Sequence, residues 1–346
     1  MAAPVGVATT RWERRGAHLL TSLGAVLLGL LVGAAILAVA GANPIRAYGA
    51  MVEGAIGSRF AVSQVLVQAV PLLIIGLGLA FAFRGRVWNI GAEGQFHLGA
   101  LAGGAVAIAA PIPVAAVQLP LAMLLGAASG GAWAWVVGTL RARWRVNEVI
   151  SSLLLNYVAI YWYSYFIRKP LRDPEGFLPQ SRAIPASAQL PSLPGLDVHA
   201  GLLIALALVP LVAYTMHRTP FGFRAAALGL NADAAEAAGI HAGRTIVRLM
   251  VISGAMAGLA GVIQILGVQL RLQYGISPGF GFTAIIVALL GRTQPVGVLL
   301  AAMLIAGLSV GGAAVQFTQG IPIAAVFTMQ ASFVLFLVVA DRVVRR

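Results

Sequence analysis

Long apolar runs dominate this chain and decide what it can fold into. A membrane-spanning helix needs about 20 consecutive apolar residues. Eight stretches are close to that length or exceed it: 18–41, 62–83, 115–140, 149–167, 199–216, 247–270, 295–315 and 322–340. Two shorter apolar pieces, 94–111 and 279–291, lie between them. The sequence therefore predicts an all-α polytopic membrane protein with 8–10 transmembrane segments, about 10 if both short pieces are counted.

The overall composition excludes a water-soluble fold. Hydrophobic residues make up 60% of the 346 residues, charged residues make up 10%, and the mean hydropathy is +0.92. Soluble domains average about 45–50% apolar and about 25% charged residues. The net charge of +13 does not indicate nucleic-acid binding, because the arginines fall between apolar runs rather than along one face. The absence of cysteine excludes a disulfide framework and a thiolate metal site.

The arginines predict the orientation of the chain. An even number of spans places both termini on one side, and 16 of the 23 basic residues then share that side with the termini. Basic residues concentrate in cytoplasmic segments, so both termini are expected in the cytoplasm. The predicted organisation has tails at 1–17 and 342–346 and a transmembrane domain at 18–341. That domain contains an outer loop, 168–198, and a cytoplasmic loop, 217–246. The first apolar run is too long for a signal peptide and is expected to be retained.

Two glycine-rich, polar stretches precede the short apolar pieces. FAFRGRVWNIGAEGQFHLGALAG covers Phe81–Gly103, and RLQYGISPGFGFTAIIVALLGRTQPVG covers Arg271–Gly297. Short interrupted segments at corresponding places in two inverted halves are typical of transport sites. Irregular backbone at membrane depth persists only where protein or a water-filled cavity satisfies its polar groups. The sequence therefore predicts two broken or re-entrant helices in two inverted repeat halves.

Polar and aromatic side chains in these segments are candidates for a translocation path. The candidates are Asn89, Glu93, Gln95, Asn156, Gln264, Phe280 and Phe282. Several alternatives remain open. Glu93 suits a helix N-terminus but could also pair with an arginine. Asn156 could line a pore or bond between helices, and the phenylalanines could stack on a base or simply pack. Asn147 and Glu148 are expected to cap the helix that carries Asn156.

The cytoplasmic loop contains a predicted short helix. Asn231 suits the N-cap, Asp233 and Glu236 follow early, and Gly239 stands just after the last helical residue. A helix of one to two turns is marginal alone, so a docking partner would help to hold it. The alternative is a structured connector without a partner.

Four strings in this order resemble one protein family: NIGAEGQFHLGA, NEVISSLLLNY, GLNADAAEAAGI and GFGFTAIIVALLGR. They are similar to the permease subunit of ABC importers for simple sugars and nucleosides, with branched-chain amino-acid permeases as more distant relatives. The resemblance covers roughly residues 60–340. It implies inward translocation of a nucleoside or ribose-like sugar by alternating access across a bacterial inner membrane. It also implies a coupling helix against an ATPase subunit, made by Asn231, Asp233, Glu236, Ala237, Gly239 and Ile240.

The same resemblance implies partners: two ATPase subunits, a second permease subunit of the same or a paralogous sequence, and a solute-binding protein. This chain has no G-x-x-x-x-G-K-[ST] phosphate loop, so ATP and Mg²⁺ are expected on the partner and no cofactor on this chain. One alternative is an ion-coupled secondary transporter of a small polar solute. A membrane-embedded enzyme is disfavoured, because neither H-E-x-x-H nor G-x-S-x-G occurs.

Overall fold

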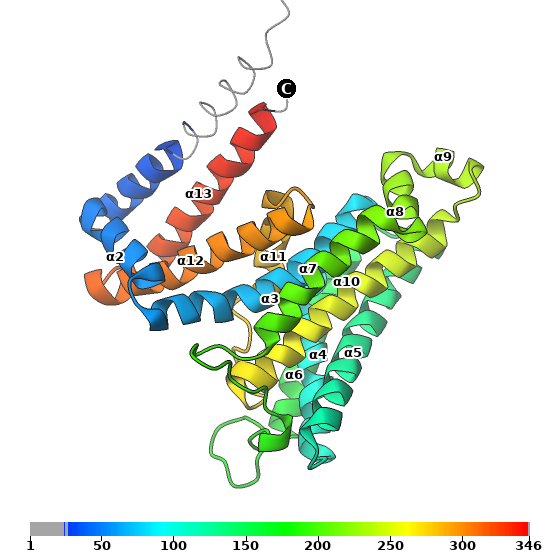
Figure 1. Cartoon of the computed structure of the whole chain (residues 1–346), viewed down its shortest axis with the longest axis horizontal. Helices are drawn as coiled ribbons and strands as arrows, with labels where there is room; N and C mark the ends of the chain where they lie inside the picture. Colours follow the sequence, from blue (N-terminus) through cyan, green and yellow to red (C-terminus); the bar gives the residue numbers. More distant parts are fainter. Residues whose placement is uncertain (1–23, 25–26, 345–346) are drawn as a thin grey trace, which may run out of the picture. The chain divides into compact units, whose positions relative to one another are not determined.

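A computed structural model describes residue 24 and residues 27–344 of the chain, and helices dominate this part (Figure 1). No strand occurs among the described residues, apart from two isolated bridges, Arg172 to Ser181 and Ser192 to His199. The all-α prediction is therefore confirmed for this part. The chain divides into two compact units, residues 62–306 and residues 1–61 with 307–346.

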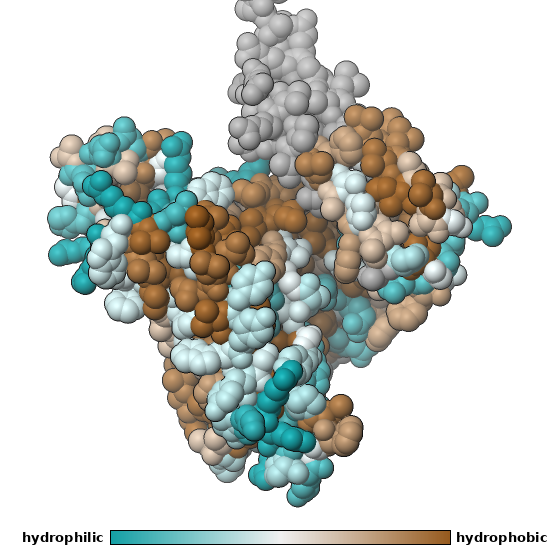
Figure 2. Space-filling model, turned by 180° about the vertical axis from the view of Figure 1, so that it is seen from behind, coloured by the Kyte–Doolittle hydropathy of each residue, from teal (hydrophilic) through white to brown (hydrophobic). Residues whose placement is uncertain are grey.

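The larger unit contains most of the helices, of which two, α3 and α12, continue into the other unit. Its elements are α3 (Arg59–Arg84), α4 (Ala92–Ala109), α5 (Ala115–Trp144), α6 (Glu148–Arg168), the single turn η1 (Ala186–Ala188), α7 (Gly201–Arg218), α8 (Pro220–Leu230), α9 (Ala232–Ala237), α10 (Ala242–Gln264), the π-helical turn η2 (Ile265–Gln269), α11 (Phe280–Leu290) and α12 (Pro295–Gln319). Hydrophilic residues gather at the end with the α8–α9 loop and at the end with the 168–198 loop (Figure 2). Hydrophobic and neutral residues lie between these ends, as a membrane-spanning unit requires.

The smaller unit contains a bent helix pair, of which the sequence analysis predicted the first helix, within the run 18–41, and missed the second. A helix over Leu27–Val39 is followed by α2 (Pro44–Ile56) at an angle of 111°. Gly41, with φ +86°, makes the turn, and the Asn43 side chain accepts hydrogen bonds from the backbone N–H groups of Ile45 and Arg46. A buried cluster holds this pair against α12 and α13 (Ile323–Val344): Leu37, Ala47, Met51, Val315, Ile321 and Met329.

The predicted number of spans is confirmed only in part by the described residues. Within the described residues, six helices are long and apolar enough to cross a membrane, or seven if the bent pair counts as one. The expected ten segments are not confirmed. The expected piece 279–291 is the separate, short helix α11. The predicted tail 1–17 lies outside the described residues, while α13 continues to Val344, beyond the predicted boundary at 341.

Glycines bring α4, α5 and α10 into close contact at the centre of the larger unit. A Cβ at Gly258 of α10 would overlap the carbonyl oxygen of Gly126 on α5, and one at Gly99 of α4 would overlap Gly258 itself. A Cβ at Gly261 would likewise overlap the carbonyl oxygen of Phe96. In lipid, where burial of apolar surface does not drive helix association, close van der Waals packing through small residues takes its place.

The 168–198 loop is held along the end of α10. The N–H groups of Ser181, Ile184 and Leu190 donate to the carbonyl oxygens of Leu272, Leu270 and Leu266, each at 2.9 Å. The loop therefore satisfies backbone groups that the π-helical turn and the residues after it leave open.

His199 lies beneath this loop, just before the span Gly201–Arg218. Its side chain is 4% exposed, its Nδ1 accepts a 3.2 Å hydrogen bond from the Gly201 N–H, and its Nε2 is buried without a hydrogen-bond partner in the structure. Burial lowers the pKa of His199 from 6.5 to about 4. The imidazole is therefore neutral in the folded chain at neutral pH.

Gly258→Val should lower the stability of the larger unit by about 3 kcal/mol, because the new side chain overlaps backbone rather than a movable side chain. The matched control is Gly243→Ala on the same helix, where the added Cβ lies 3.6 Å from the Ala142 Cβ, an ordinary contact. Thermal unfolding of both purified variants in detergent measures the difference. Equal melting temperatures would contradict the packing described here.

The stability contribution of His199 should disappear in acid. Because its folded pKa of about 4 lies below 6.5, the unfolded chain binds the proton more tightly, so stability falls as the pH drops from 6.5 to 4. The loss amounts to about 3 kcal/mol. In His199→Asn, which keeps an acceptor for the Gly201 N–H, melting temperatures between pH 7 and 4 should fall less than in the wild type. The control His217→Asn, an exposed histidine at the other end of α7, should follow the wild type.

Candidate translocation core and coupling loop

The backbone between α3 and α4 is irregular and is held by side-chain amides. Arg86 adopts φ +52°, which ends the helical path of α3. The Asn89 Nδ2 donates to the Gln95 Oε1 at 2.8 Å, and the Gln95 Nε2 donates back to the Asn89 Oδ1 at 3.0 Å. The Asn89 Oδ1 also accepts from the Gly91 N–H, and its Nδ2 also donates to the Ser253 Oγ of α10. This reciprocal pair fixes the loop to the start of α4.

Side chains of α6 satisfy the backbone of the same loop. The Asn156 Oδ1 accepts from the Gly94 N–H, and its Nδ2 donates to the Ile90 carbonyl oxygen, both at 2.8 Å. The Ile90 N–H donates to the Ser152 Oγ at 3.2 Å. Asn156 therefore makes the interhelical hydrogen bonds that were one of its two expectations, and pore lining stays a prediction. As expected, Asn147 caps α6 by accepting from the Val149 and Ile150 N–H groups.

Glu93 joins the two glycine-rich stretches that the sequence analysis paired. Its Oε2 accepts a 2.7 Å hydrogen bond from the Gly281 N–H in the first turn of α11. A Cβ at Gly281 would overlap the backbone of Glu93, so the two helix starts touch directly. The carboxylate thus lies at the positive ends of two helix dipoles, α4 and α11. The other expectation for Glu93, an arginine partner, stays a prediction, and Glu93 is not part of the ion pairs Arg141–Glu148 and Arg271–Asp173.

Phe280 lies among packed aromatic side chains. The rings of Phe96 and Phe280 lie with centroids 5.8 Å apart, and both side chains are buried. The His97 Nδ1 lies 2.8 Å from the Glu93 carbonyl oxygen, and its ring meets Tyr163 edge-on at 5.3 Å. The Phe280 ring is therefore packed rather than open.

The predicted path residues do not all meet. Phe282 is partly exposed on α11, and Gln264 is buried on α10. Asn89, Glu93, Gln95 and Asn156 form one polar region, and their exposed fractions are 0%, 3%, 0% and 1%. This polar core, as we call these four residues with Ser152 and Ser253, is closed to solvent in this structure. The two serines were not among the predicted residues, because a serine within a helix carries no signal of its own in a sequence.

An ion pair links α5 and α6 near the loop that follows α3. Arg141 of α5 bonds to Glu148 at the start of α6, and the Arg141 Nη1 also donates to the Arg86 carbonyl oxygen at 3.2 Å. The Glu148 Oε1 further accepts from the Trp88 N–H. Glu148 therefore ties α6 to α5 and to the loop after α3, in addition to standing beside the cap residue. Among the residues that the structure describes, no three His, Asp or Glu side chains gather to hold a metal ion.

The predicted short helix of the 217–246 loop is confirmed as α9. The Asn231 Oδ1 accepts from the Asp233 and Ala234 N–H groups, which is N-capping. At the other end, the Gly239 N–H donates to the Glu236 carbonyl oxygen and the Ile240 N–H to that of Ala235, with Gly239 at φ +80°. These two bonds form a Schellman motif. Six residues thus hold a helix because both ends are closed.

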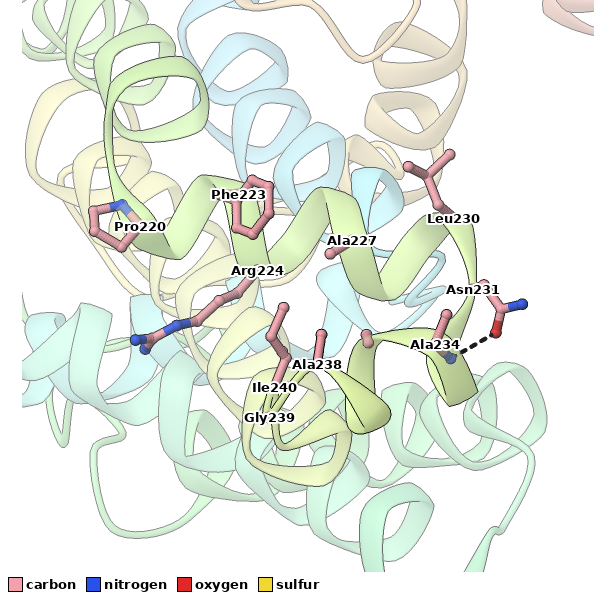
Figure 3. A pocket seen from close by; sticks show the side chains of 11 residues that line it. Pro220, Phe223, Arg224, Ala227, Leu230, Asn231, Ala234, Ala238, Gly239 and Ile240 are labelled. Carbon is pink, nitrogen blue, oxygen red and sulfur yellow. Dashed lines mark hydrogen bonds between the residues drawn. The ribbon is translucent and has the colours of Figure 1, made fainter.

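A largely apolar groove of about 540 Å³ separates α9 from α8 (Figure 3). On its α8 side Phe223 is 68% exposed and Leu230 is 80% exposed. Ala234, Ala238 and Ile240 form the other wall. Asp233 and Glu236 instead line a separate, polar cavity of about 610 Å³ that also includes Arg141 and Arg145. The two faces of α9 therefore differ in chemistry, one apolar and one charged.

A known family matches this chain. Residues 61–340 match the family described as the branched-chain amino acid transport system / permease component. The chain belongs to this permease family. It is a multi-pass membrane subunit of an ABC importer and not an enzyme.

Several curated relatives resemble this permease along almost its whole length. A glucose ABC transporter permease protein of Haloferax volcanii is 40% identical over 95% of this chain and 88% of its own length. A guanosine ABC transporter permease protein of Bacillus subtilis is 37% identical over 93% of this chain and 94% of its own. A nucleoside ABC transporter permease protein of Lactococcus lactis is 32% identical over 92% of this chain and 90% of its own.

Asn156→Leu should lower the stability of the permease by about 2–4 kcal/mol, since the Gly94 N–H and the Ile90 carbonyl lose their partners. The apparent melting temperature in detergent measures this loss. Tyr157→Leu is the control, because the neighbouring Tyr157 is exposed and makes no contact to this loop. A variant as stable as this control would show that the loop does not depend on Asn156.

Proposed function

We propose that this permease moves a nucleoside or a ribose-like sugar inward through an ABC importer. The observation that carries the proposal is the set of relatives at 32–40% identity, which are named for guanosine, nucleosides and glucose and align over more than nine-tenths of this chain. Phe96 and Phe280 pack on each other, so stacking on a base in this conformation would fall to Phe282. The sequence itself favours neither solute class.

We propose α9 as the coupling helix, with Asn231, Asp233, Glu236, Ala237, Gly239 and Ile240 as its residues. Its two caps support this role, because a helix closed at both ends can transmit a push without fraying. The exposed Phe223 and Leu230 beside it provide apolar contact area for an ATPase subunit. ATP and Mg²⁺ would then bind that partner, while a solute-binding protein and a second permease subunit complete the importer.

The polar core supports a proposal for alternating access. In this structure its side chains bond to one another and to backbone N–H groups, and these bonds link α4, α6, α10 and the start of α11. A second state that separates these helices would expose Asn89, Glu93, Gln95 and Asn156 to water and to the solute. Only a difference in the binding of ATP or solute between the two states can drive that change. Gln264 and Phe282 remain proposed path residues on the neighbouring helices.

The last proposals concern the orientation of the permease and its location in the cell. We propose that both termini face the cytoplasm of a bacterium and that the permease resides in the inner membrane. The arginine distribution supports this orientation. It places the 217–246 loop on the ATPase side and the 168–198 loop on the side of the solute-binding protein. The transmembrane domain would then span 18–341, with two inverted halves.

Uptake into vesicles that contain the reconstituted importer should distinguish the functions. We expect radiolabelled guanosine or glucose to accumulate only with ATP, and an uncoupler to have no effect. Unlabelled guanosine and glucose in competition would identify the solute class. Uptake that survives without ATP but fails with an uncoupler would support the ion-coupled alternative instead.

Glu236→Pro should abolish this uptake, since proline inside α9 removes a hydrogen bond and clashes with the preceding turn. Ala232→Pro is the matched control, because the first helical position tolerates proline and the preceding Asn231 is already extended, with φ −158° and ψ 115°. We expect uptake to persist in this control while both variants insert normally. Uptake at the wild-type level in Glu236→Pro would remove the role of α9.

A further inference from the structure

Four exposed arginines surround the N-terminal part of α10 without acidic partners. They are Arg143 of α5, Arg224 of α8, and Arg244 and Arg248 of α10. Within residues 24 and 27–344, none of them forms an ion pair, whereas Arg141 pairs with Glu148 and Arg271 lies 3.9 Å from Asp173. The four charges therefore attract an anion that does not belong to the described part of this chain.

The arginines border two cavities that share one wall. A cavity of about 400 Å³ lies between α5 and α10 and is lined by Trp135, Thr139, Ala142, Arg143, Gly243, Arg244, Val247 and Arg248. A second, of about 340 Å³, lies between α8 and α10 and is lined by Phe221, Arg224, Val247, Arg248, Val251 and Ile252. Val247 and Arg248 belong to both. Arg248 is thus the central cation of the surface.

Helical spacing explains why charge and apolar surface adjoin. On α10, Arg244, Arg248 and Ile252 follow at intervals of four, so they form one stripe that changes from charged to apolar along the helix. On α5, Trp135, Thr139 and Arg143 form the matching stripe. Trp135 is 53% exposed, and tryptophan is enriched at the boundary between hydrocarbon and water. Both stripes therefore cross that boundary in the same direction.

We propose that this surface binds an anionic phospholipid. Its phosphate lies over Arg248, within reach of Arg143 and Arg244, and its acyl chains extend past Val251, Ile252 and Trp135. Guanidinium groups bind phosphate oxygens in pairs, and basic pockets between transmembrane helices on the cytoplasmic side suit anionic lipid headgroups. The arginine distribution predicts this end to be cytoplasmic.

The apolar continuation favours a lipid over an acidic protein. Both cavities continue from arginine onto apolar residues of α10, Val247 in each and Val251 and Ile252 in the second, which acyl chains would cover. Arg224 adds a connection to the coupling loop, because it lines both the α8–α10 cavity and the α8–α9 groove. In Figure 3 its side chain extends away from Asn231 and Leu230.

The test measures binding of a fluorescent phosphatidylglycerol to the purified full-length permease in neutral detergent. The triple variant Arg143→Gln, Arg244→Gln and Arg248→Gln should bind at least about tenfold more weakly. The matched triple variant Arg84→Gln, Arg86→Gln and Arg218→Gln removes the same charge from other exposed or partly exposed positions and should bind as the wild type does. Val251→Trp, which fills the apolar cavity, should also weaken binding while keeping every arginine. Unchanged melting temperatures establish that the variants are folded.

Four outcomes would overturn the proposal. The first is equal binding by the wild type and the Arg143, Arg244, Arg248 triple variant. The second is displacement of the lipid by inorganic phosphate at the same concentration, which would identify a site for free anions. The third is a variant that binds lipid normally but loses its ATPase partner in a pull-down, which would assign the arginines to a protein contact. Binding of fluorescent phosphatidylcholine as tight as that of phosphatidylglycerol would also contradict the role of charge.

Discussion

The hydrogen bond from the Gly281 N–H to the Glu93 carboxylate is the interaction on which the centre of this permease depends. Inside a bilayer no water can satisfy an interrupted helix, so each free backbone group needs a partner from the protein. Two helices, α4 and α11, begin in the interior of the larger unit with free N–H groups. Glu93 accepts from the start of α11, Asn156 accepts from the first turn of α4, and Ser152 accepts from the loop just before α4. The carboxylate remains in so apolar a place because two helix dipoles and a backbone donor stabilise its charge.

The glycines allow these polar groups and the helices that carry them to approach one another closely. A side chain at Gly281 would overlap Glu93, and one at Gly94 would come within 3.0 Å of Asn156. The contacts of Gly99, Gly126 and Gly258 bring α4, α5 and α10 similarly close to one another. Polar bonds and glycine contacts therefore support each other, because side-chain amides can reach the backbone only where the helices nearly touch. A conformational change that opens the polar core has to break these polar hydrogen bonds and separate these glycine contacts. Its free-energy cost therefore includes both.

Much of this arrangement could be predicted from the sequence, and the rest has physical reasons for escaping it. Hydrophobic length predicts most of the spans, and Asn231 with Gly239 predicts α9, because caps are local signals. The helix α2 was missed because it has a polar face, with Arg46 and Glu53, beside its apolar stripe. A segment with these charges was interpreted as part of an outer loop. The partner of Glu93 is a backbone N–H 188 residues away. Almost every residue type has this group, so the sequence does not predict the contact. Hydrophobic length alone does not fix the number of spans, since a short helix such as α11 is stabilised by its neighbours and not by its own length.

The position of α8 relates the membrane surface to the coupling loop. This helix begins with the Thr219 cap, packs Phe221 edge-on against Phe81 of α3, and ends at Asn231, where α9 starts. Arg224 on α8 borders both the groove toward α9 and the cavity that we assign to a phospholipid. A ligand that orients Arg224 from one side changes the surface presented on the other. Any coupling between lipid and ATPase subunit is reciprocal, because each must change the affinity of the other by the same factor. Because α8 ends at Asn231, the residue that caps α9, the two surfaces are joined through two consecutive helices, so no long pathway through the bundle is required.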